Sequence, residues 1–179
     1  MANLYTVGHG TRDLDELVAI LNGAGVRKLI DARSTPRSRR FPHFGYGPLG
    51  ARLAAEGVGY DWRRVLGGRR RLEGRPRHPG LTDPAFQAYA EYMEGDAFRS
   101  AVLQLAVEAG SEAICLMCAE RDPDRCHRSL IADWLVAQGH RVVHLIASGQ
   151  SREHRLHPAV RLDGGRLCYL GGDVQQELF

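Results

Sequence analysis

Four short, predominantly apolar runs constrain the fold of this chain more than any other feature of its sequence. They lie at residues 4–7, 28–32, 113–117 and 141–146. A short apolar run between turn signals is typical of a strand that is buried on both faces. Because helix-length segments separate most of these runs, the pattern predicts parallel strands joined by crossover helices. The predicted fold class is α/β, with a mostly parallel open sheet flanked by helices in three layers.

Further elements are expected around these runs. Helical spacing of apolar residues predicts helices near residues 14–21, 49–56, 83–93, 97–109 and 125–138, and a short strand is expected at 59–62. Two segments close to the end, joined by Asp-Gly-Gly, predict a hairpin. We therefore divide the chain into an α/β core over residues 1–147 and a C-terminal extension over residues 148–179 that packs on the core.

The composition is that of a globular protein. Hydrophobic residues make up 44% of the 179 positions and charged residues 25%, which suits one domain with one sizeable core. No apolar run approaches the roughly 20 residues of a membrane-spanning helix, and the first residues lack the features of a signal peptide. We expect a cytoplasmic protein with no membrane partner. Its four unevenly spaced cysteines are expected to be reduced thiols.

Positive charge is concentrated in one part of the chain. Residues 33–77 contain twelve arginines and three acidic residues, a balance of +9, although the net charge of the whole chain is only +3. Arg33, Arg37 and Arg39 lie in a loop that also contains aromatic side chains, a combination that suits phosphates and unstacked bases. These three arginines are candidate ligands of a phosphate or a nucleic acid. The alternative is a solvated, arginine-rich surface.

Polar side chains follow three of the predicted strands at the points where those strands end. His9 follows the first strand, Asp31 lies at the end of the second, and Cys118 and Glu120 follow residues 113–117. Because the carboxyl ends of parallel strands share one edge of a sheet, and ligands bind there, we expect a common pocket. His9, Asp31, Cys118 and Glu120 are candidate catalytic residues. A plain strand-to-helix turn is the alternative for His9.

The motif CAERDPDRCHR at residues 118–128 joins a predicted strand to a predicted helix. Its central aspartate and proline suit a helix start, so that Cys126, His127 and Arg128 would fall in the first turn. A helix N-terminus favours an anion and lowers the pKa of a nearby thiol. Arg128 is therefore a candidate phosphate ligand, and His127 is a candidate catalytic acid or base.

Three functional interpretations of this motif stay open. Cys118 can act as a nucleophile, although Glu120 nearby would raise its pKa. Cys118, Cys126 and His127 can bind zinc, although paired-cysteine spacing is absent and adjacent helical residues diverge by about 100°. The motif can also bind a phosphate or nucleotide, held by Arg128 and the helix start, with Glu120 as acid or base. In a fourth, structural interpretation these cysteines and His127 belong to the core.

The last five residues predict a protein partner. They read Gln-Gln-Glu-Leu-Phe, and they resemble the short peptide with which bacterial polymerases and repair proteins dock on the sliding clamp. In such a peptide Gln175, Leu178 and Phe179 would make the anchoring contacts, with the last two filling apolar pockets. A chain end that packs on its own core is the alternative.

Several blocks of the sequence, taken in their order, resemble the bacterial domain-of-unknown-function 488 family. The blocks are Thr6-Val7-Gly8-His9-Gly10-Thr11, Asp31-Ala32-Arg33 with Pro36 and Ser38-Arg39, Leu66-Gly67-Gly68, and Cys118-Ala119-Glu120 with Pro123 and Cys126-His127-Arg128. The resemblance covers most of residues 4–146 and departs at Gly10, where the family more often has serine. It implies an α/β domain and a link to DNA repair, but it implies no particular reaction.

The sequence therefore favours an enzyme that processes a nucleotide or nucleic acid at the carboxyl ends of its strands. A non-catalytic module that associates with DNA and docks on the clamp is the first alternative. A metal-binding or redox thiol protein, with zinc as the cofactor, is the second.

Overall fold

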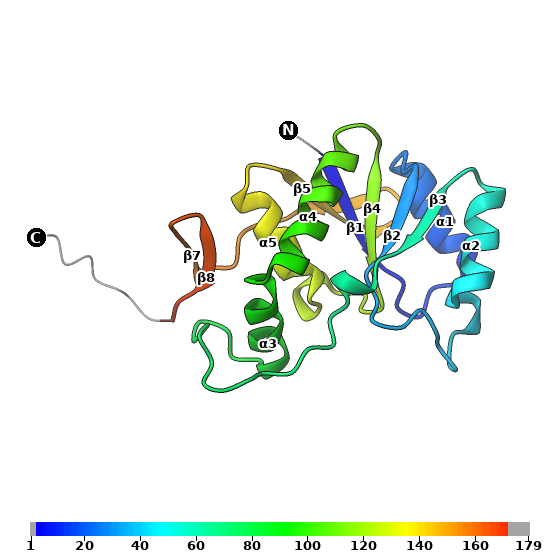
Figure 1. The fold of residues 1–179 in the computed structure, drawn as a ribbon. Helices are drawn as coiled ribbons and strands as arrows, with labels where there is room; N and C mark the ends of the chain where they lie inside the picture. The colour runs from blue at the N-terminus through cyan, green and yellow to red at the C-terminus, as the bar shows by residue number, and fades with distance from the viewer. Residues whose placement is uncertain (1–2, 172–179) are drawn as a thin grey trace, which may run out of the picture.

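The computed structural model describes residues 3–171. Apart from one short strand, its strands and helices follow one another as the sequence predicts (Figure 1). The strands are β1 (Asn3–Gly8), β2 (Lys28–Asp31), β3 (Gly59–Trp62), β4 (Ile114–Cys118), β5 (Arg141–Ala147), β6 (Gln150–Glu153), β7 (Val160–Asp163) and β8 (Arg166–Tyr169). The helices are α1 (Leu14–Gly23), α2 (Tyr46–Ala55), α3 (Pro84–Met93), α4 (Asp96–Ala109) and α5 (Arg128–Ala137).

The predicted fold class is confirmed. Six strands form one sheet in the order β3-β2-β4-β1-β5-β6, in which the first five strands are parallel and β6 is antiparallel to β5. The predicted C-terminal hairpin is also present, as β7 and β8. The sequence does not predict β6, because its four residues are all exposed and polar and carry no apolar pattern.

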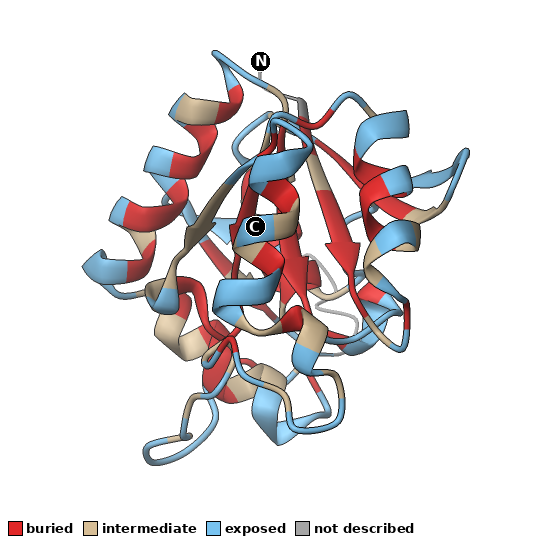
Figure 2. Ribbon diagram, turned by 90° about the vertical axis from the view of Figure 1, so that its right-hand side faces the viewer, coloured by how far each residue is buried: buried red, intermediate tan, exposed pale blue. Residues whose placement is uncertain are grey.

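Helices cover both faces of the sheet, which makes three layers. Along β4, Ile114, Leu116 and Cys118 pack in one core with α3, α4 and α5, whereas Cys115 and Met117 pack in a second core with α1 and α2. Burial on both faces explains why the strand is apolar at every position. Figure 2 shows the same division, with buried residues along the sheet and on the inner sides of the helices.

The two central strands send the chain in opposite directions. After β1 the chain passes through α1 to β2, which lies beyond β4; after β4 it passes through α5 to β5, which lies beyond β1. The loops that follow β1 and β4 stay paired through His9 and Gly10 and then lead to α1 and α5 on opposite faces of the sheet. Such a switch in direction creates a crevice at the carboxyl ends of the strands, where open α/β sheets bind ligands.

The last helix begins later than residues 125–138 suggest. A short 3₁₀ turn at Pro123–Arg125 comes first, Cys126 has an extended backbone with φ −137° and ψ 141°, and α5 begins at Arg128. His127 is the N-cap of α5. The expectation that Cys126 and His127 lie inside the first turn was therefore wrong, because the aspartate and proline of the motif start the 3₁₀ turn instead of the helix.

A chain of buried polar groups connects β1, β5 and α5 with the segment after β6. His154 Nε2 donates to Asp133 at 2.9 Å, and its Nδ1 lies 2.8 Å from His144 Nε2. The other nitrogen of His144, Nδ1, lies 2.6 Å from the Thr6 hydroxyl. His144 therefore has one partner at each ring nitrogen, which suits the neutral ring, because one nitrogen donates and the other accepts.

Because His144 is buried in its neutral form, acid is expected to destabilise the protein. Burial, helped by the charges of His154, Arg128 and Arg152, lowers the pKa of His144 to about 3, whereas the pKa is about 6.5 in an unfolded chain. Below pH 6.5 the unfolded chain binds a proton that the folded protein does not bind, so stability falls as the pH falls toward 3. Between pH 6.5 and pH 5 the free energy of unfolding should fall by about 2 kcal/mol through this residue.

Urea unfolding at several pH values measures this effect. The variant His144→Gln, which cannot titrate there, should lose less stability than the wild type over the same pH interval. Equal losses in the two proteins would contradict the assignment of the acid sensitivity to His144.

The sequence analysis also made predictions about a membrane and about a sliding clamp as partners. Among residues 3–171, no helix is long and apolar enough to cross a membrane. Gln175, Leu178 and Phe179 lie outside the described residues, so docking on a sliding clamp stays a prediction.

Candidate functional site

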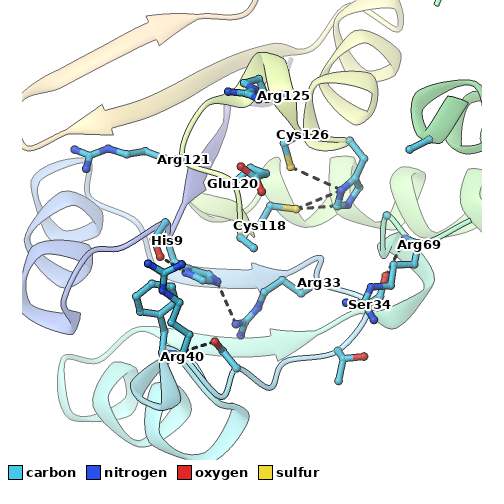
Figure 3. Close-up of a pocket in the computed structure, with 18 of the residues that line it drawn as sticks. His9, Arg33, Ser34, Arg40, Arg69, Cys118, Glu120, Arg121, Arg125 and Cys126 are labelled. Carbon is cyan, nitrogen blue, oxygen red and sulfur yellow. Dashed lines mark hydrogen bonds between the residues drawn. The ribbon is translucent and has the colours of Figure 1, made fainter. Parts of the chain in front are cut away.

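A cavity of about 850 Å³ lies at the carboxyl ends of β1, β2 and β4 (Figure 3). Residues from five separate parts of the chain line it. They are His9, Gly10, Thr11, Arg33, Ser34, Thr35, Arg37, Ser38, Arg40, Phe41, Gly68, Arg69, Ala85, Phe86, Cys118, Ala119, Glu120, Arg121, Arg125, Cys126 and His127. The predicted convergence of strand ends therefore exists as a pocket that is open to solvent.

Direct pairing of β1 with β4 brings two of these parts together. Gly8 is in register with Cys118, and the pairing continues beyond the strands, because the His9 amide donates to the Cys118 carbonyl at 2.9 Å. A Cβ atom on Gly8 would lie 1.8 Å from the carbonyl oxygen of Glu120. Only glycine permits so close an approach of two backbones, so Gly8 is what allows the Glu120 loop to cover the end of β1.

A buried ion pair between Asp31 and Arg33 lies next to His9. Asp31 is fully buried and accepts from Arg33 Nε at 2.9 Å and Nη2 at 2.6 Å, from the Arg33 amide at 3.0 Å, and from the Tyr60 hydroxyl at 2.6 Å. Burial and the Asp31 carboxylate raise the pKa of Tyr60, which therefore stays a hydrogen-bond donor. Asp31 is absent from the cavity lining, but it fixes the guanidinium of Arg33, which is part of that lining.

His9 enters the cavity as a neutral imidazole. Its Nδ1 donates to the Gly10 carbonyl at 3.0 Å, so its Nε2 is an acceptor, and Arg33 Nη1 lies 3.4 Å from it. The ring stacks on Phe44 at a centroid distance of 4.4 Å. Burial lowers the pKa of His9 to about 4, and the charge of Arg33 adds to the effect. At neutral pH His9 can therefore accept a proton or a hydrogen bond but contributes no charge.

Three metal-ligand side chains meet at the opposite wall of the cavity. Cys118 Sγ lies 3.6 Å from His127 Nδ1 and 3.5 Å from His127 Nε2, and Cys126 Sγ lies 3.7 Å from Nδ1. Both cysteines are free thiols and are almost completely buried. Burial raises the pKa of Cys118 well above its ordinary value, and a hydrogen bond from the Cys118 thiol lowers the pKa of Cys126 well below it.

The segment that follows β3 holds the imidazole of His127 in place. His127 Nε2 donates to the Leu66 carbonyl at 3.1 Å, and the Tyr89 ring lies 4.8 Å from the imidazole between centroids. A Cβ atom on Gly68 would lie 2.3 Å from His127 Nδ1 and 2.7 to 2.8 Å from the two neighbouring ring carbons. These nearly equal distances put Gly68 over the face of the ring. The in-plane lone pair of Nδ1 is therefore not covered by Gly68.

Arginines surround the mouth of the cavity. Six of them belong to its lining, whereas Glu120 is the single acidic residue there. In Figure 3, Arg33, Arg40, Arg69, Arg121 and Arg125 lie around Cys118. The six are Arg33, Arg37, Arg40, Arg69, Arg121 and Arg125. Such an excess of positive charge around a concave site attracts and concentrates anions.

The structure separates the predicted phosphate ligands into two groups. Arg33 and Arg37 line the cavity, whereas Arg39 is exposed and does not. Arg128 is buried, and its guanidinium donates to the carbonyl oxygens of Glu120 and Arg121. Its place in the fold is to hold the loop after β4, because its Nη1 and Nη2 atoms donate to backbone oxygens of that loop and Arg128 is absent from the cavity lining.

Several lining residues were not predicted as site residues. Arg40, Arg69, Arg121 and Arg125 lie in loops where one arginine looks like any other in the sequence. Gly68 carries a clearer signal, because its pairing with a second glycine at the head of a basic loop indicates a close contact. That contact, with the His127 ring, becomes visible only in three dimensions.

Comparison with known proteins finds one match. Residues 13–135 match the family model described as "Domain of unknown function DUF488". No curated protein and no solved structure matches the chain.

Proposed function

Since this chain belongs to the DUF488 family, whose description names no activity, we propose from the chemistry of its own site that it is an enzyme acting on a nucleotide or nucleic acid. The observation that carries this proposal is the ring of six arginines around a cavity whose wall holds Cys118, Cys126 and His127. The arginines can bind the phosphate groups of a ligand, and the thiols and the imidazole are reactive groups beside it.

The arginines suit phosphate because most of them are not already paired with carboxylates. In the part of the chain that the structure describes, Arg33 is paired with Asp31, and Arg121 lies 3.8 Å from Glu16. The remaining four lining arginines form no ion pair among the described residues. Guanidinium groups bind phosphate oxygens in a bidentate manner, so unpaired arginines in a concave site favour a phosphorylated ligand over a neutral one.

The size and the aromatic lining of the cavity favour a nucleotide. A volume of about 850 Å³ is within the range of small-molecule and cofactor sites. Phe41 and Phe86 belong to the lining, and aromatic faces stack on unpaired bases. Phosphate groups at the arginines and a base against these rings would use both properties of the site.

The reactive groups of the cavity are the side chains of Cys118, Cys126 and His127 and the carboxylate of Glu120. Glu120 is exposed and lines the cavity, so it can exchange protons with solvent and act as a general acid or base. His9 is neutral and faces Arg33, which suits it to accept a hydrogen bond from a substrate. Arg33 is held rigidly by Asp31, so it can orient a phosphate with little loss of side-chain entropy.

Binding of a fluorescent single-stranded oligonucleotide, with nucleotides as competitors, tests the anion site. The double variant Arg37→Ala/Arg40→Ala should weaken binding about tenfold or more at low salt, and it should flatten the salt dependence of the binding constant. Arg27→Ala is the matched control, because Arg27 is exposed and precedes β2 at the opposite edge of the sheet. Equal losses in the two proteins would contradict a specific anion site in the cavity.

Catalysis is tested separately from binding. We expect Cys118→Ser and Glu120→Gln to reduce conversion of the bound nucleotide substrate by about 100-fold or more while the affinity for the oligonucleotide is retained. Incubation with a panel of nucleotides and oligonucleotides, followed by mass spectrometry of the products, measures the conversion. Full activity in the combined variant would exclude Cys118 and Glu120 from catalysis, and no conversion by the wild type would leave a non-catalytic binding module as the function.

A further inference from the structure

We propose that Cys118 Sγ, Cys126 Sγ and His127 Nδ1 bind a divalent metal ion of the zinc type, with the fourth coordination position open to the cavity. This inference deepens the proposed function, and it rests on that function only in taking the cavity as the place of the substrate. The three ligand atoms lie within 4.8 Å of one another.

The two sulfur–nitrogen distances match those of a tetrahedral site. Zinc binds thiolate sulfur at about 2.3 Å and imidazole nitrogen at about 2.0–2.1 Å. Around a tetrahedral ion these bond lengths require a sulfur–nitrogen separation of about 3.6 Å. The sulfur atoms of Cys118 and Cys126 lie 3.6 and 3.7 Å from His127 Nδ1. The Cys118 sulfur also lies 3.5 Å from Nε2, so the Cys118 side chain or the imidazole must turn for all three atoms to bind one ion.

The tautomer of His127 leaves the correct nitrogen free. Because a carbonyl oxygen can only accept, the contact of 3.1 Å between His127 Nε2 and the Leu66 carbonyl puts the proton on Nε2. In the neutral ring Nδ1 is then the nitrogen with the free lone pair, and both sulfur atoms lie within 3.7 Å of it. Histidine ligands of metals commonly donate their second ring N–H to a carbonyl or carboxylate, which fixes the orientation of the ring.

The backbone around Cys126 removes the main objection to a shared ion. The sequence places Cys126 and His127 in adjacent helical positions, from which side chains diverge by about 100°. In the structure Cys126 is extended and His127 is the N-cap residue that precedes α5. The two side chains can therefore converge on one point, which the expected helix would not have permitted.

Burial and charge also favour an ion at this position. Cys118 and Cys126 are 2% and 4% exposed, and a divalent cation would neutralise the two thiolates that it binds in this buried position. Two thiolates, a neutral imidazole and a divalent cation add up to a neutral group. Soft sulfur ligands with imidazole select zinc over magnesium or calcium.

The number of ligands indicates a reactive site and not a purely structural one. Structural zinc sites have four protein ligands, whereas catalytic sites have three and keep one position for water or substrate. All three ligand residues line the cavity that holds the arginines and Glu120. An ion there would lie next to a bound phosphorylated ligand, where it can polarise an oxygen of the substrate or lower the pKa of a bound water.

Cobalt and zinc titration of the full chain after treatment with a chelator tests the site. We expect one equivalent of Co²⁺ to bind and to produce the thiolate-to-cobalt charge-transfer bands and the visible bands of a tetrahedral ion, and we expect Zn²⁺ to displace it. Cys118→Ser and Cys126→Ser should each weaken binding about 100-fold and reduce the charge-transfer intensity. Cys168→Ser is the matched control, since that thiol lies on the β8 hairpin strand, and it should bind like the wild type.

Alkylation of the wild-type protein provides a measurement that needs no variant. Zn²⁺ should protect Cys118 and Cys126 from a thiol reagent and leave the reactivity of Cys168 unchanged. The proposal is overturned if the chelator-treated protein binds no equivalent of metal, if Cys168→Ser loses as much affinity as the other variants, or if the two thiols form a disulfide and bind no metal.

These results are distinguishable from a failure of the proposed function. Oligonucleotide binding that depends on Arg37 and Arg40, together with no metal binding, would overturn the metal site and leave the anion site standing. Stoichiometric metal binding without any binding of oligonucleotide or nucleotide would support the metal site and overturn the proposed function.

Discussion

Replacing Asp31 by alanine is expected to lower the free energy of unfolding by about 3–5 kcal/mol. The carboxylate is fully buried and accepts hydrogen bonds from three nitrogens of Arg33 and from the Tyr60 hydroxyl. Without it, the Arg33 guanidinium keeps the Phe44 carbonyl as its main partner and stays in an environment where it is only 7% exposed. A buried charge that has lost its counter-charge is among the most destabilising consequences of a single substitution.

Urea unfolding measures this effect, and Tyr60→Phe is the matched control. That variant removes one hydrogen bond to Asp31 but keeps the ion pair, so it should cost only about 1 kcal/mol. Oligonucleotide binding by Asp31→Ala should also weaken, because Arg33 loses the partner that fixes its position in the cavity. A loss of stability no larger than that of Tyr60→Phe would show that the Asp31–Arg33 pair is not the main support of this edge of the sheet.

The second large effect is expected from Gly8→Ala. The added Cβ atom would lie 1.8 Å from the carbonyl oxygen of Glu120, 2.6 Å from its carbonyl carbon and 2.8 Å from the Cα atom of Arg121. All three are backbone atoms, so no side-chain rotation can relieve the clash. The loop after β4 must move away from β1, at a cost of about 3 kcal/mol.

Gly23→Ala separates this clash from the general effect of adding a methyl group. Gly23 is the last residue of α1, and nothing is within 4 Å of the position that its Cβ would take. Because alanine favours a helix by up to about 1 kcal/mol relative to glycine, this variant should be at least as stable as the wild type. Thermal and urea unfolding measure both variants. Metal uptake by Gly8→Ala should also fall, because Cys118 is in register with Gly8. A stable Gly8→Ala protein with normal metal uptake would contradict the close contact.

The two large effects and the metal site concern the same few residues at the ends of β1, β2 and β4. Asp31 fixes the position of Arg33, and Gly8 allows the Glu120 loop to approach the end of β1 closely. Arg128 donates to two backbone oxygens of that loop and so holds it in place. Stability and function are thus expected to be lost together in variants of this edge. Variants of surface arginines should instead weaken ligand binding and leave the free energy of unfolding nearly unchanged.

The sequence by itself was enough to predict the fold class and the edge of the sheet that carries the site. Runs such as residues 113–117 are apolar at every position because both faces of their strand are buried, and that requirement is visible without coordinates. The carboxyl-end rule then placed His9, Arg33 and Cys118 together, because it depends only on the direction of parallel strands.

Only the tertiary structure decided how the side chains at that edge are used. Arg128 is buried against carbonyl oxygens while Arg40 lines the cavity, and their sequence contexts do not distinguish these roles, because the direction of a long side chain depends on residues far away in the chain. The same holds for Cys126 and His127. Their convergence on Cys118 follows from an extended backbone at Cys126 and from a hydrogen bond to Leu66, 61 positions away, and neither is a property of the local sequence pattern.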